Sequence, residues 1–194
     1  MRTHMLTLGL AAVLLAAGGC NKGAENRANP QTPEAQKAAG NKTIAAGLAQ
    51  GTKFMAAAKA AGLDQTLAGA GPYTVLVPDD AAFDKAPAGT FDTKPENRAQ
   101  LTGVVTNLIL PGTVLVADID KAIDKGKGKA VLATYGGGTL TATKDGGKIV
   151  FADSKGGKAT VNKADETYTN GVVHHIDAVL MPSKRGAAPP TKAG

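Results

Sequence analysis

The last third of the chain alternates between apolar and polar residues with a period of two, and this pattern limits the fold more than any other feature. Each alternating segment is short, and glycine-rich turns separate most of them. Such close turns join antiparallel neighbours, because parallel strands need longer crossovers. The glycines of YGGGT predict a turn and not a phosphate loop, since no helix follows them. We predict strands over 130–135, 139–144, 148–153, 158–163 and 172–181, with 164–169 as a connection.

The residues before position 130 have mostly helical spacing. An alanine-rich segment at 43–69 predicts two short helices, with Thr43 and Thr52 as N-caps. A longer amphipathic helix is predicted from position 95 onward, because apolar residues recur three and four positions apart. Pro111 and Gly112 are predicted to end it.

Two further strands are predicted among these helices, at 73–77 and 113–119. Asp79 follows the first of them and is expected to cap a helical turn by accepting the backbone N–H groups of Ala81 and Ala82. Helices that come first and close-set hairpins that come later are typical of an α+β domain with mostly antiparallel pairing.

Both ends of the chain differ in composition from its middle. Residues 1–19 carry one early positive charge and a short apolar run, which predicts an export signal. The sequence around Cys20 resembles the lipobox of bacterial lipoproteins, which implies cleavage before Cys20 and its lipidation. Residues 20–41 contain almost no large apolar side chains and predict a flexible tether. The folded domain is predicted over 42–183 and a disordered tail over 184–194.

The sequence contains no convincing set of catalytic residues. Asp79 and Asp80 are adjacent, but helix capping and surface solvation explain them. The chain has two serines, Ser154 and Ser183, and neither lies in a nucleophile elbow. We therefore expect no enzyme activity and no cofactor.

Two adjacent histidines, His174 and His175, lie in the last predicted strand. Neighbouring strand residues point to opposite faces, so these two side chains cannot hold one ion together. We expect His174 to be neutral and buried, donating one ring N–H to a carbonyl. His175 is expected near the surface, close to Asp177. The third histidine, His4, falls in the signal, so no metal site is predicted.

Three stretches in sequence order, YTVLVPDDAAFDKAP, LTGVVTNLILPG and NGVVHHIDAVLMP, resemble the fasciclin (FAS1) domain family. The resemblance covers residues 43–182. It implies a β-wedge of two mostly antiparallel sheets with several short helices packed around them. The family motif positions in this chain are Pro78, Asp79, Phe83, Pro111, Gly112, Asn170, Gly171, His174 and Asp177.

The resemblance also implies a function outside the cytoplasm. Family members serve as extracellular adhesion or recognition modules, and some carry small hydrophobic ligands such as carotenoids. Many members have Tyr-His before the central Pro-Gly, in a region implicated in receptor binding. Here Asn107 and Leu108 occupy those positions, so they are the candidate partner-binding residues.

These features together predict a lipid-anchored, non-catalytic module of the bacterial cell envelope, facing the periplasm or the cell surface. Its expected partners are the membrane, through the lipid anchor, and an envelope protein or polysaccharide. The alternative is a carrier of a small hydrophobic molecule, for which we expect an apolar cleft near Leu108. Residues 118–129 predict a short helix that leads into a solvated loop, and the lysines at 120–129 have an acidic polysaccharide or lipid headgroup as their alternative contact. No aromatic residues alternate with these lysines, so no nucleic-acid partner is expected.

Overall fold

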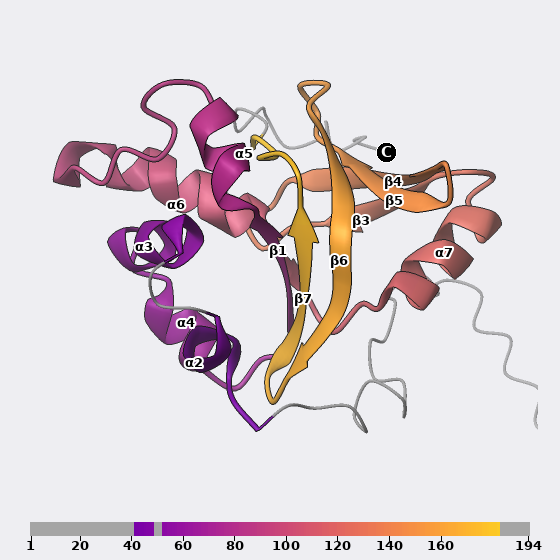
Figure 1. Cartoon of the computed structure of the whole chain (residues 1–194), viewed down its shortest axis with the longest axis horizontal. Helices are drawn as coiled ribbons and strands as arrows, with labels where there is room; N and C mark the ends of the chain where they lie inside the picture. The colour runs from indigo at the N-terminus through magenta and orange to yellow at the C-terminus, as the bar shows by residue number, and fades with distance from the viewer. Residues whose placement is uncertain (1–40, 49–51, 183–194) are drawn as a thin grey trace, which may run out of the picture.

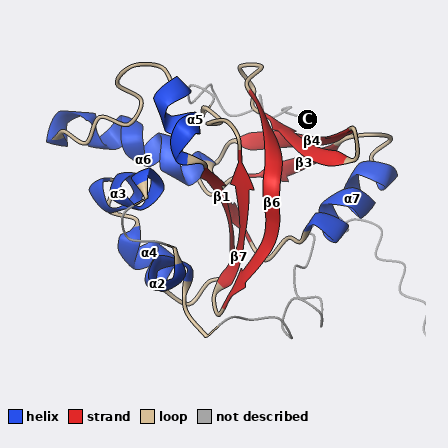
Figure 2. Ribbon diagram, in the orientation of Figure 1, coloured by secondary structure: helices blue, strands red, loops and turns tan. Residues whose placement is uncertain are grey.

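The computed structural model describes residues 41–48 and 52–182, whose strands form one continuous sheet (Figures 1 and 2). Its seven strands follow the order β2-β1-β7-β6-β5-β4-β3, and all neighbours are antiparallel except the parallel pair β1 and β7. The predicted α+β fold class is confirmed. The strands are β1 (Tyr73–Pro78), β2 (Ile109–Pro111), β3 (Ala130–Ala133), β4 (Thr139–Asp145), β5 (Lys148–Ala152), β6 (Lys158–Tyr168) and β7 (Gly171–Ile176).

The predicted signal peptide, Cys20, nearly all of the tether and the tail at 184–194 lie outside the described residues. Their predictions therefore stay predictions.

The long strand β6 belongs to both halves of the sheet. Its first residues pair with β5, and its residues from Val161 onward pair with β7. Register shifts interrupt the second pairing, and Asp165 within them has a φ of 56°. Irregularities of this kind bend and twist a strand. The two sheets expected for a FAS1 wedge are thus two halves of one sheet, joined through β6 (Figure 2).

The two outer strands of the sheet approach each other at one end. Tyr135, just after β3, donates its N–H to the carbonyl of Ile109 in β2 at 2.7 Å. The Tyr135 ring also packs edge-on against that of Tyr73, with 6.3 Å between the ring centroids. Within the described residues β3 itself pairs only with β4, so the sheet stays open along β3.

The helices lie in two groups around the sheet (Figure 1). Helices α2 to α6 gather beside β1 and β7, whereas α7 lies apart and packs against β3, β4 and β5. No helix in the described ranges has both the length and the apolar character needed to cross a membrane. Their bounds are α2 (Ile44–Gly47), α3 (Lys53–Ala60), α4 (Asp64–Ala68), α5 (Asp80–Lys85), the 3-10 helix η1 (Pro95–Asn97), α6 (Arg98–Asn107) and α7 (Val116–Lys125).

The core lies between the sheet and these helices. Phe54 of α3, Leu101 of α6 and Ile119 of α7 are almost completely inaccessible, as is Phe151 of β5. Each fully buried side chain of this size contributes about 1.5–3 kcal/mol to folding. The chain has a single cysteine and therefore no internal disulfide. Packing alone must hold this domain together.

The predicted N-caps of the first two helices are confirmed. The hydroxyl of Thr43 accepts the N–H of Ala46, and that of Thr52 accepts the N–H of Met55, each at 3.4 Å. These caps satisfy backbone donors that have no partner within the helix.

The predicted strand over 113–119 is wrong, because helix α7 begins at Val116. The Val116 N–H is accepted by the Asp165 carboxylate at 2.9 Å, and the Leu115 N–H by the Asp118 carboxylate at 3.3 Å. Negative charge near a helix N-terminus stabilises the helix. The Asp165 carboxylate belongs to β6, which is far from α7 in the sequence.

The predicted end of the central helix at Pro111 and Gly112 is also wrong. Helix α6 ends at Asn107, and the residues that follow form β2. Ile109 of β2 pairs with Val75 of β1. The residues after Asn107 extend the apolar pattern of the helix, but they pair with β1 as strand β2 instead.

The last two strands have different ends from those predicted. Strand β6 continues to Tyr168, through residues predicted to be a connection. Strand β7 stops at Ile176. The Asp177 carboxylate then accepts the N–H of Thr160 at 2.6 Å, which fixes the backbone beyond the strand to β6.

Candidate functional site

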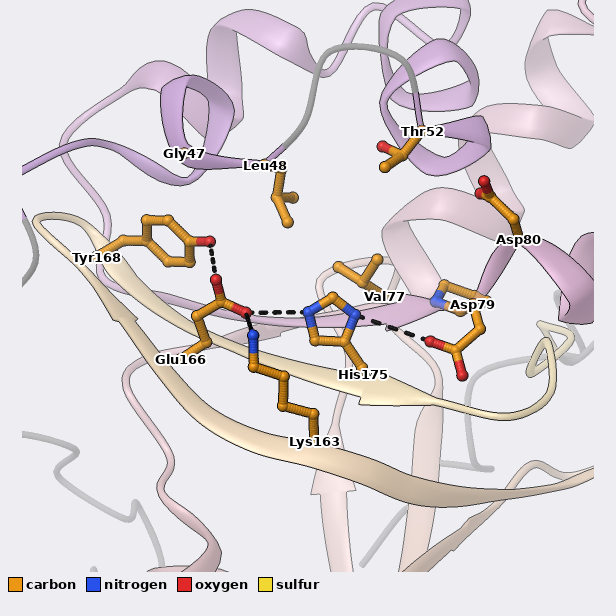
Figure 3. A pocket seen from close by; sticks show the side chains of 11 residues that line it. Gly47, Leu48, Thr52, Val77, Asp79, Asp80, Lys163, Glu166, Tyr168 and His175 are labelled. Atoms are coloured by element: carbon orange, nitrogen blue, oxygen red, sulfur yellow. Dashed lines mark hydrogen bonds and ion pairs between the residues drawn. The ribbon is translucent and has the colours of Figure 1, made fainter.

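A surface pocket of about 400 Å³ lies between the helices α2, α3 and α5 and the strands β6 and β7 (Figure 3). Val77 of β1 lies beside His175 of β7 on the sheet side of the pocket, and Leu48 lies on the helical side together with the polar residues Thr52 and Asp80. It is lined by Gly47, Leu48, Thr52, Val77, Pro78, Asp79, Asp80, Lys163, Glu166, Tyr168 and His175.

Strand pairing brings the charged residues of the pocket together. Lys163 of β6 lies opposite His175 of β7, and opposite residues of an antiparallel pair share one face. Glu166 and Tyr168 are two positions apart, so they also share a face. In a regular strand Lys163 and Glu166 would point to opposite faces, because three positions separate them. The register shift between these two residues, which contains Asp165, puts both on the pocket side.

Glu166 is the centre of a hydrogen-bond network in the pocket. One carboxylate oxygen accepts the Tyr168 hydroxyl at 2.8 Å. The other accepts Nζ of Lys163 and lies against Nε2 of His175, each at 3.0 Å (Figure 3). Burial alone would raise the pKa of Glu166, but the hydrogen bonds from Lys163, Tyr168 and His175 outweigh it and lower that pKa to about 2. The carboxylate is therefore ionised at any physiological pH.

Tyr168 is affected in the opposite direction. Its burial and its hydrogen bond to the charged Glu166 carboxylate both raise the pKa of the phenol. Tyr168 thus stays a hydrogen-bond donor and cannot act as a base.

Asp79 lies at the other side of His175. Its carboxylate is 3.9 Å from Nδ1 of His175 and accepts the side-chain amide of Asn162 at 2.8 Å. The predicted side-chain cap from Asp79 to the following helix is wrong, since that helix starts without one. The Asp79 carboxylate instead accepts the side-chain amide of Asn162 on β6.

Asp80 is also more than a solvated surface residue, because its carboxylate accepts the N–H of Lys53 at 3.2 Å.

His174 lies on the opposite face of β7, in the core. Its side chain is 0% exposed, and Nε2 is 2.8 Å from the carbonyl of Val114. Nδ1 accepts the Asp165 N–H at 3.1 Å, so the proton of the neutral ring is on Nε2 and is donated to that carbonyl. Burial lowers the pKa of His174, and the charge on nearby Asp165 opposes this only in part. The expected ring-to-carbonyl hydrogen bond is present.

His175 is not beside Asp177, where the sequence predicts it. It has 25% of its side chain exposed and faces Glu166 and Asp79 instead. The prediction is wrong because β7 ends at Ile176, so the alternation that would put the two side chains on one face stops before Asp177.

The candidate partner-binding residues Asn107 and Leu108 are not at the surface, which overturns that assignment. They are 2% and 0% exposed. The Asn107 amide donates to the Leu180 carbonyl at 3.3 Å and accepts the Thr134 hydroxyl at 3.5 Å. Leu108 is part of the hydrophobic core, so its side chain does not line a cleft at the surface.

The other family motif positions fix the backbone around the site. The Asn170 side chain donates to the carbonyls of Leu67 and Gly69 and accepts the Ile44 N–H. Gly171 has a φ of 153°, and a Cβ there would meet the Tyr73 carbonyl oxygen.

The remaining motif residues also have structural contacts. Phe83 packs against Phe91 with 4.2 Å between the ring centroids. Gly112 accepts the hydroxyl of Thr74 at 2.7 Å. Pro78 ends β1, and Pro111 ends β2.

Sequence reasoning missed the central residues of the pocket, Lys163, Glu166 and Tyr168. The pair Glu166 and Tyr168 does carry a strand-like spacing of two. The irregular backbone at Asp165 breaks the alternation between these residues and Lys163, so the segment has the pattern of a loop.

The arrangement in the pocket suits binding better than proton transfer. Glu166 is ionised but already has three hydrogen-bond partners, so it is a poor general base. In the ranges that the structure describes, no group of three His, Cys, Asp or Glu side chains is placed to hold a metal ion. What the pocket offers is a fixed negative charge, an ammonium group and an apolar wall.

Comparison with known proteins relates the chain to proteins with this fold. The sequence model of the fasciclin domain matches residues 49–182. Protein sll1483 of Synechocystis sp. is 35% identical over 147 residues, which cover 75% of this chain and 71% of that protein. The transforming growth factor-beta-induced protein ig-h3 of Sus scrofa is 32% identical over 127 residues, 66% of this chain but only 17% of that protein.

A solved structure shows the same fold. A FAS1 domain pair from the insect cell adhesion molecule fasciclin I matches with a TM-score of 0.56 and 19% sequence identity. The match covers 74% of this chain and 52% of that chain. This chain thus corresponds to about half of the insect domain pair.

Proposed function

Because this chain belongs to the fasciclin (FAS1) domain family, we propose that it is a non-catalytic adhesion or recognition module that binds a protein or polysaccharide partner. The matched FAS1 pair comes from a cell adhesion molecule, which supports this class of function. The observation that carries the proposal is the state of Glu166. Three donors hold its carboxylate in a surface pocket, where it serves recognition and not proton transfer.

The pocket is the proposed contact region for the partner. Lys163 is the natural residue to vary, because 66% of its side chain is exposed and its loss leaves the core intact. We expect Lys163→Glu to reduce capture of the envelope partner at least about tenfold. Lys148→Glu is the matched control, since it makes the same charge change on the exposed start of β5. Equal capture by both variants would exclude the pocket as the contact region.

The proposed location is the bacterial cell envelope, with Cys20 as the lipid anchor and residues 21–41 as a tether. A flexible coil of this length lets the folded head search a volume near the membrane. Globomycin should cause the precursor to accumulate, and Cys20→Ser should release the head from the membrane fraction. Absence of lipid on Cys20 would refute the anchor while leaving the recognition function standing.

An alternative function is that of a carrier for a small hydrophobic molecule. It is favoured by the apolar wall of the pocket, to which Leu48 and Val77 contribute. A carrier purified from native envelopes should yield a bound molecule on solvent extraction and mass spectrometry. Repeated recovery of empty protein would decide against this alternative.

A further inference from the structure

Strand β6 has an extra residue at the point where it passes His174 of β7. Two residues of β6, Ala164 and Asp165, lie opposite this one histidine. An arrangement of two residues against one is a β-bulge, and it interrupts the alternation of side chains along the strand. The pairs on either side of the bulge are Lys163 with His175 and Glu166 with Val173.

The bulge decides which face of the sheet Glu166 occupies. Without the extra residue, Glu166 would lie opposite Val172 instead of Val173. Neighbouring strand residues point to opposite faces, so a slip of one position would turn the carboxylate to the face of the buried Val172. With the bulge, Glu166 points into the pocket and meets its three hydrogen-bond donors (Figure 3). The Glu166 network therefore depends on this bulge.

The backbone of the bulge needs contacts that hold it in place. Asp165 has a φ of 56°, in the left-handed region that side chains other than glycine rarely adopt. Such a conformation persists where the surrounding structure fixes it. Two contacts do so here: the Asp165 N–H is accepted by Nδ1 of His174 at 3.1 Å, and the Asp165 carboxylate accepts the N–H of Val116 at 2.9 Å.

These two contacts differ in how firmly they hold Asp165. The Asp165 side chain is 42% exposed, so water can replace its bond to Val116. The His174 side chain is 0% exposed, and its other ring nitrogen is held by the Val114 carbonyl at 2.8 Å. Nδ1 of His174 is therefore a fixed acceptor on the core side of the sheet. It is the contact that sets where the Asp165 backbone lies.

We propose that His174 is a positioning residue for the pocket, because its Nδ1 holds the Asp165 N–H, maintains the bulge in β6 and so keeps Glu166 directed into the pocket. The two adjacent histidines then act on one carboxylate from the two faces of β7. His175 contacts Glu166 directly, and His174 acts on it through the backbone. The importance of this role for binding rests on the proposed recognition function of the pocket.

Amide side chains can separate the two ring nitrogens of His174. The amide oxygen of asparagine is as many bonds from the backbone as Nδ1 of histidine, so His174→Asn retains an acceptor for the Asp165 N–H. The amide nitrogen of glutamine corresponds in the same way to Nε2, so His174→Gln retains only the donor to the Val114 carbonyl. His174→Leu retains neither group.

The test observes Glu166 directly and needs no binding partner. All samples are the full chain with Cys20→Ser, which removes the single thiol, and carry ¹³C-labelled glutamate. The NMR titration of the native Glu166 carboxylate should give a pKa of about 2. In His174→Gln and His174→Leu we expect this pKa to rise by at least about one pH unit, because the carboxylate leaves its donors. In His174→Asn it should stay near the native value.

A second measurement at pH 7 keeps the test independent of acid stability. Nuclear Overhauser contacts from the Glu166 side chain to the rings of Tyr168 and His175 should be present in the native protein and in His174→Asn. They should be lost in His174→Gln and His174→Leu.

Two controls separate positioning from a general loss of stability. Asp165→Gly keeps the N–H and suits the positive φ, so Glu166 should stay in place although Val116 loses its acceptor. Leu140→Val weakens the core within β4, away from the bulge, and should also leave Glu166 in place.

Two results would overturn the proposal. One is a Glu166 network that is intact in both His174→Gln and His174→Leu. The other is equal disruption in His174→Asn and His174→Gln, which would mean that the ring acts only through core stability. Neither result bears on recognition through the pocket, which the capture experiment with Lys163→Glu tests separately.

Discussion

His174 and His175 are neighbours in sequence, yet they carry their rings into two different environments on opposite faces of β7. The His174 ring is completely buried between Val114 and Asp165. The His175 ring lies in the surface pocket between Glu166 and Asp79. The first histidine therefore stabilises the core, and the second belongs to the proposed recognition region.

Replacing His174 by leucine should destabilise the domain strongly. The variant removes the hydrogen-bond partner of the Val114 carbonyl and of the Asp165 N–H, both partly buried, and we expect a loss of about 1–3 kcal/mol in the free energy of unfolding. Urea denaturation at pH 7.5 measures it. His175→Leu is the control and should cost less than about 1 kcal/mol, because water reaches that side chain. Equal losses would contradict the different roles assigned to the two rings.

The stability of the domain should fall as the pH drops below 6.5, and His174 should be a cause. Burial lowers the pKa of His174 in the folded state from its ordinary value of 6.5, so below that pH the unfolded chain binds more protons. The charge on Asp165 opposes this lowering of the His174 pKa, whereas His175 lowers that pKa further. The stability gap between wild type and His174→Leu should therefore narrow as the pH falls from 7.5 to 5.5. A constant gap would show that this ring does not titrate on unfolding.

Glu166 should stabilise the fold above pH 4.5 and lose this effect as the pH falls toward 2. Its pKa drops from 4.5 to about 2 on folding, so the folded state binds fewer protons in this window. We expect Glu166→Gln to cost about 1–2 kcal/mol at pH 6, less than the full shift implies, because water screens a side chain that is about one third exposed. The two unfolding curves should converge near pH 2. Glu96→Gln, an exposed control, should leave the curve unchanged.

Gly171→Ala should disrupt the centre of the sheet. A Cβ at this position would lie 1.9 Å from the Tyr73 carbonyl oxygen, and the φ of 153° is unfavourable for alanine. We expect a loss of about 3 kcal/mol or more. Gly137→Ala is the matched control: its φ is also positive, but nothing lies within 4 Å, so it should cost about 1 kcal/mol. Thermal unfolding followed by circular dichroism compares the two.

Asn170→Ala should loosen the attachment of the first helices to the end of β7. The buried side chain donates to Leu67 and Gly69 and accepts from Ile44, so its loss leaves backbone groups without partners. We expect a loss of about 2–4 kcal/mol and faster hydrogen exchange in α2 and α4. Asn162→Ala should cost less than about 1 kcal/mol, since that exposed amide makes one hydrogen bond. Unchanged exchange in α2 would argue against this attachment.

The parts of the fold that depend on local interactions were predictable from the sequence. The helix caps at Thr43 and Thr52 lie within three residues of the N–H groups they accept. The hairpins between β3 and β5 follow directly from glycine turns and alternation. The burial of His174 also follows from its position on the apolar face of a strand.

The parts that failed depend on partners far away in the sequence. Helix α7 begins where the Asp165 carboxylate of β6 accepts the Val116 N–H. Asp79 does not cap the helix that follows it, and its carboxylate accepts the side-chain amide of Asn162 on β6 instead. The network around Glu166 needs an irregular backbone that no alternation rule predicts. The candidate site was therefore the least predictable part of the molecule.

The position of β7 in the sheet determines when the fold can be completed during synthesis of the chain. This last strand lies between β1 and β6, and its parallel partner β1 is made about a hundred residues earlier. Until Ile176 leaves the ribosome, β1 has only the short β2 beside it, and the middle of the sheet is absent. Contacts between such distant segments form slowly, because a long loop must close first. A growing polypeptide of this design therefore cannot close the middle of its sheet until almost all of its residues have been made.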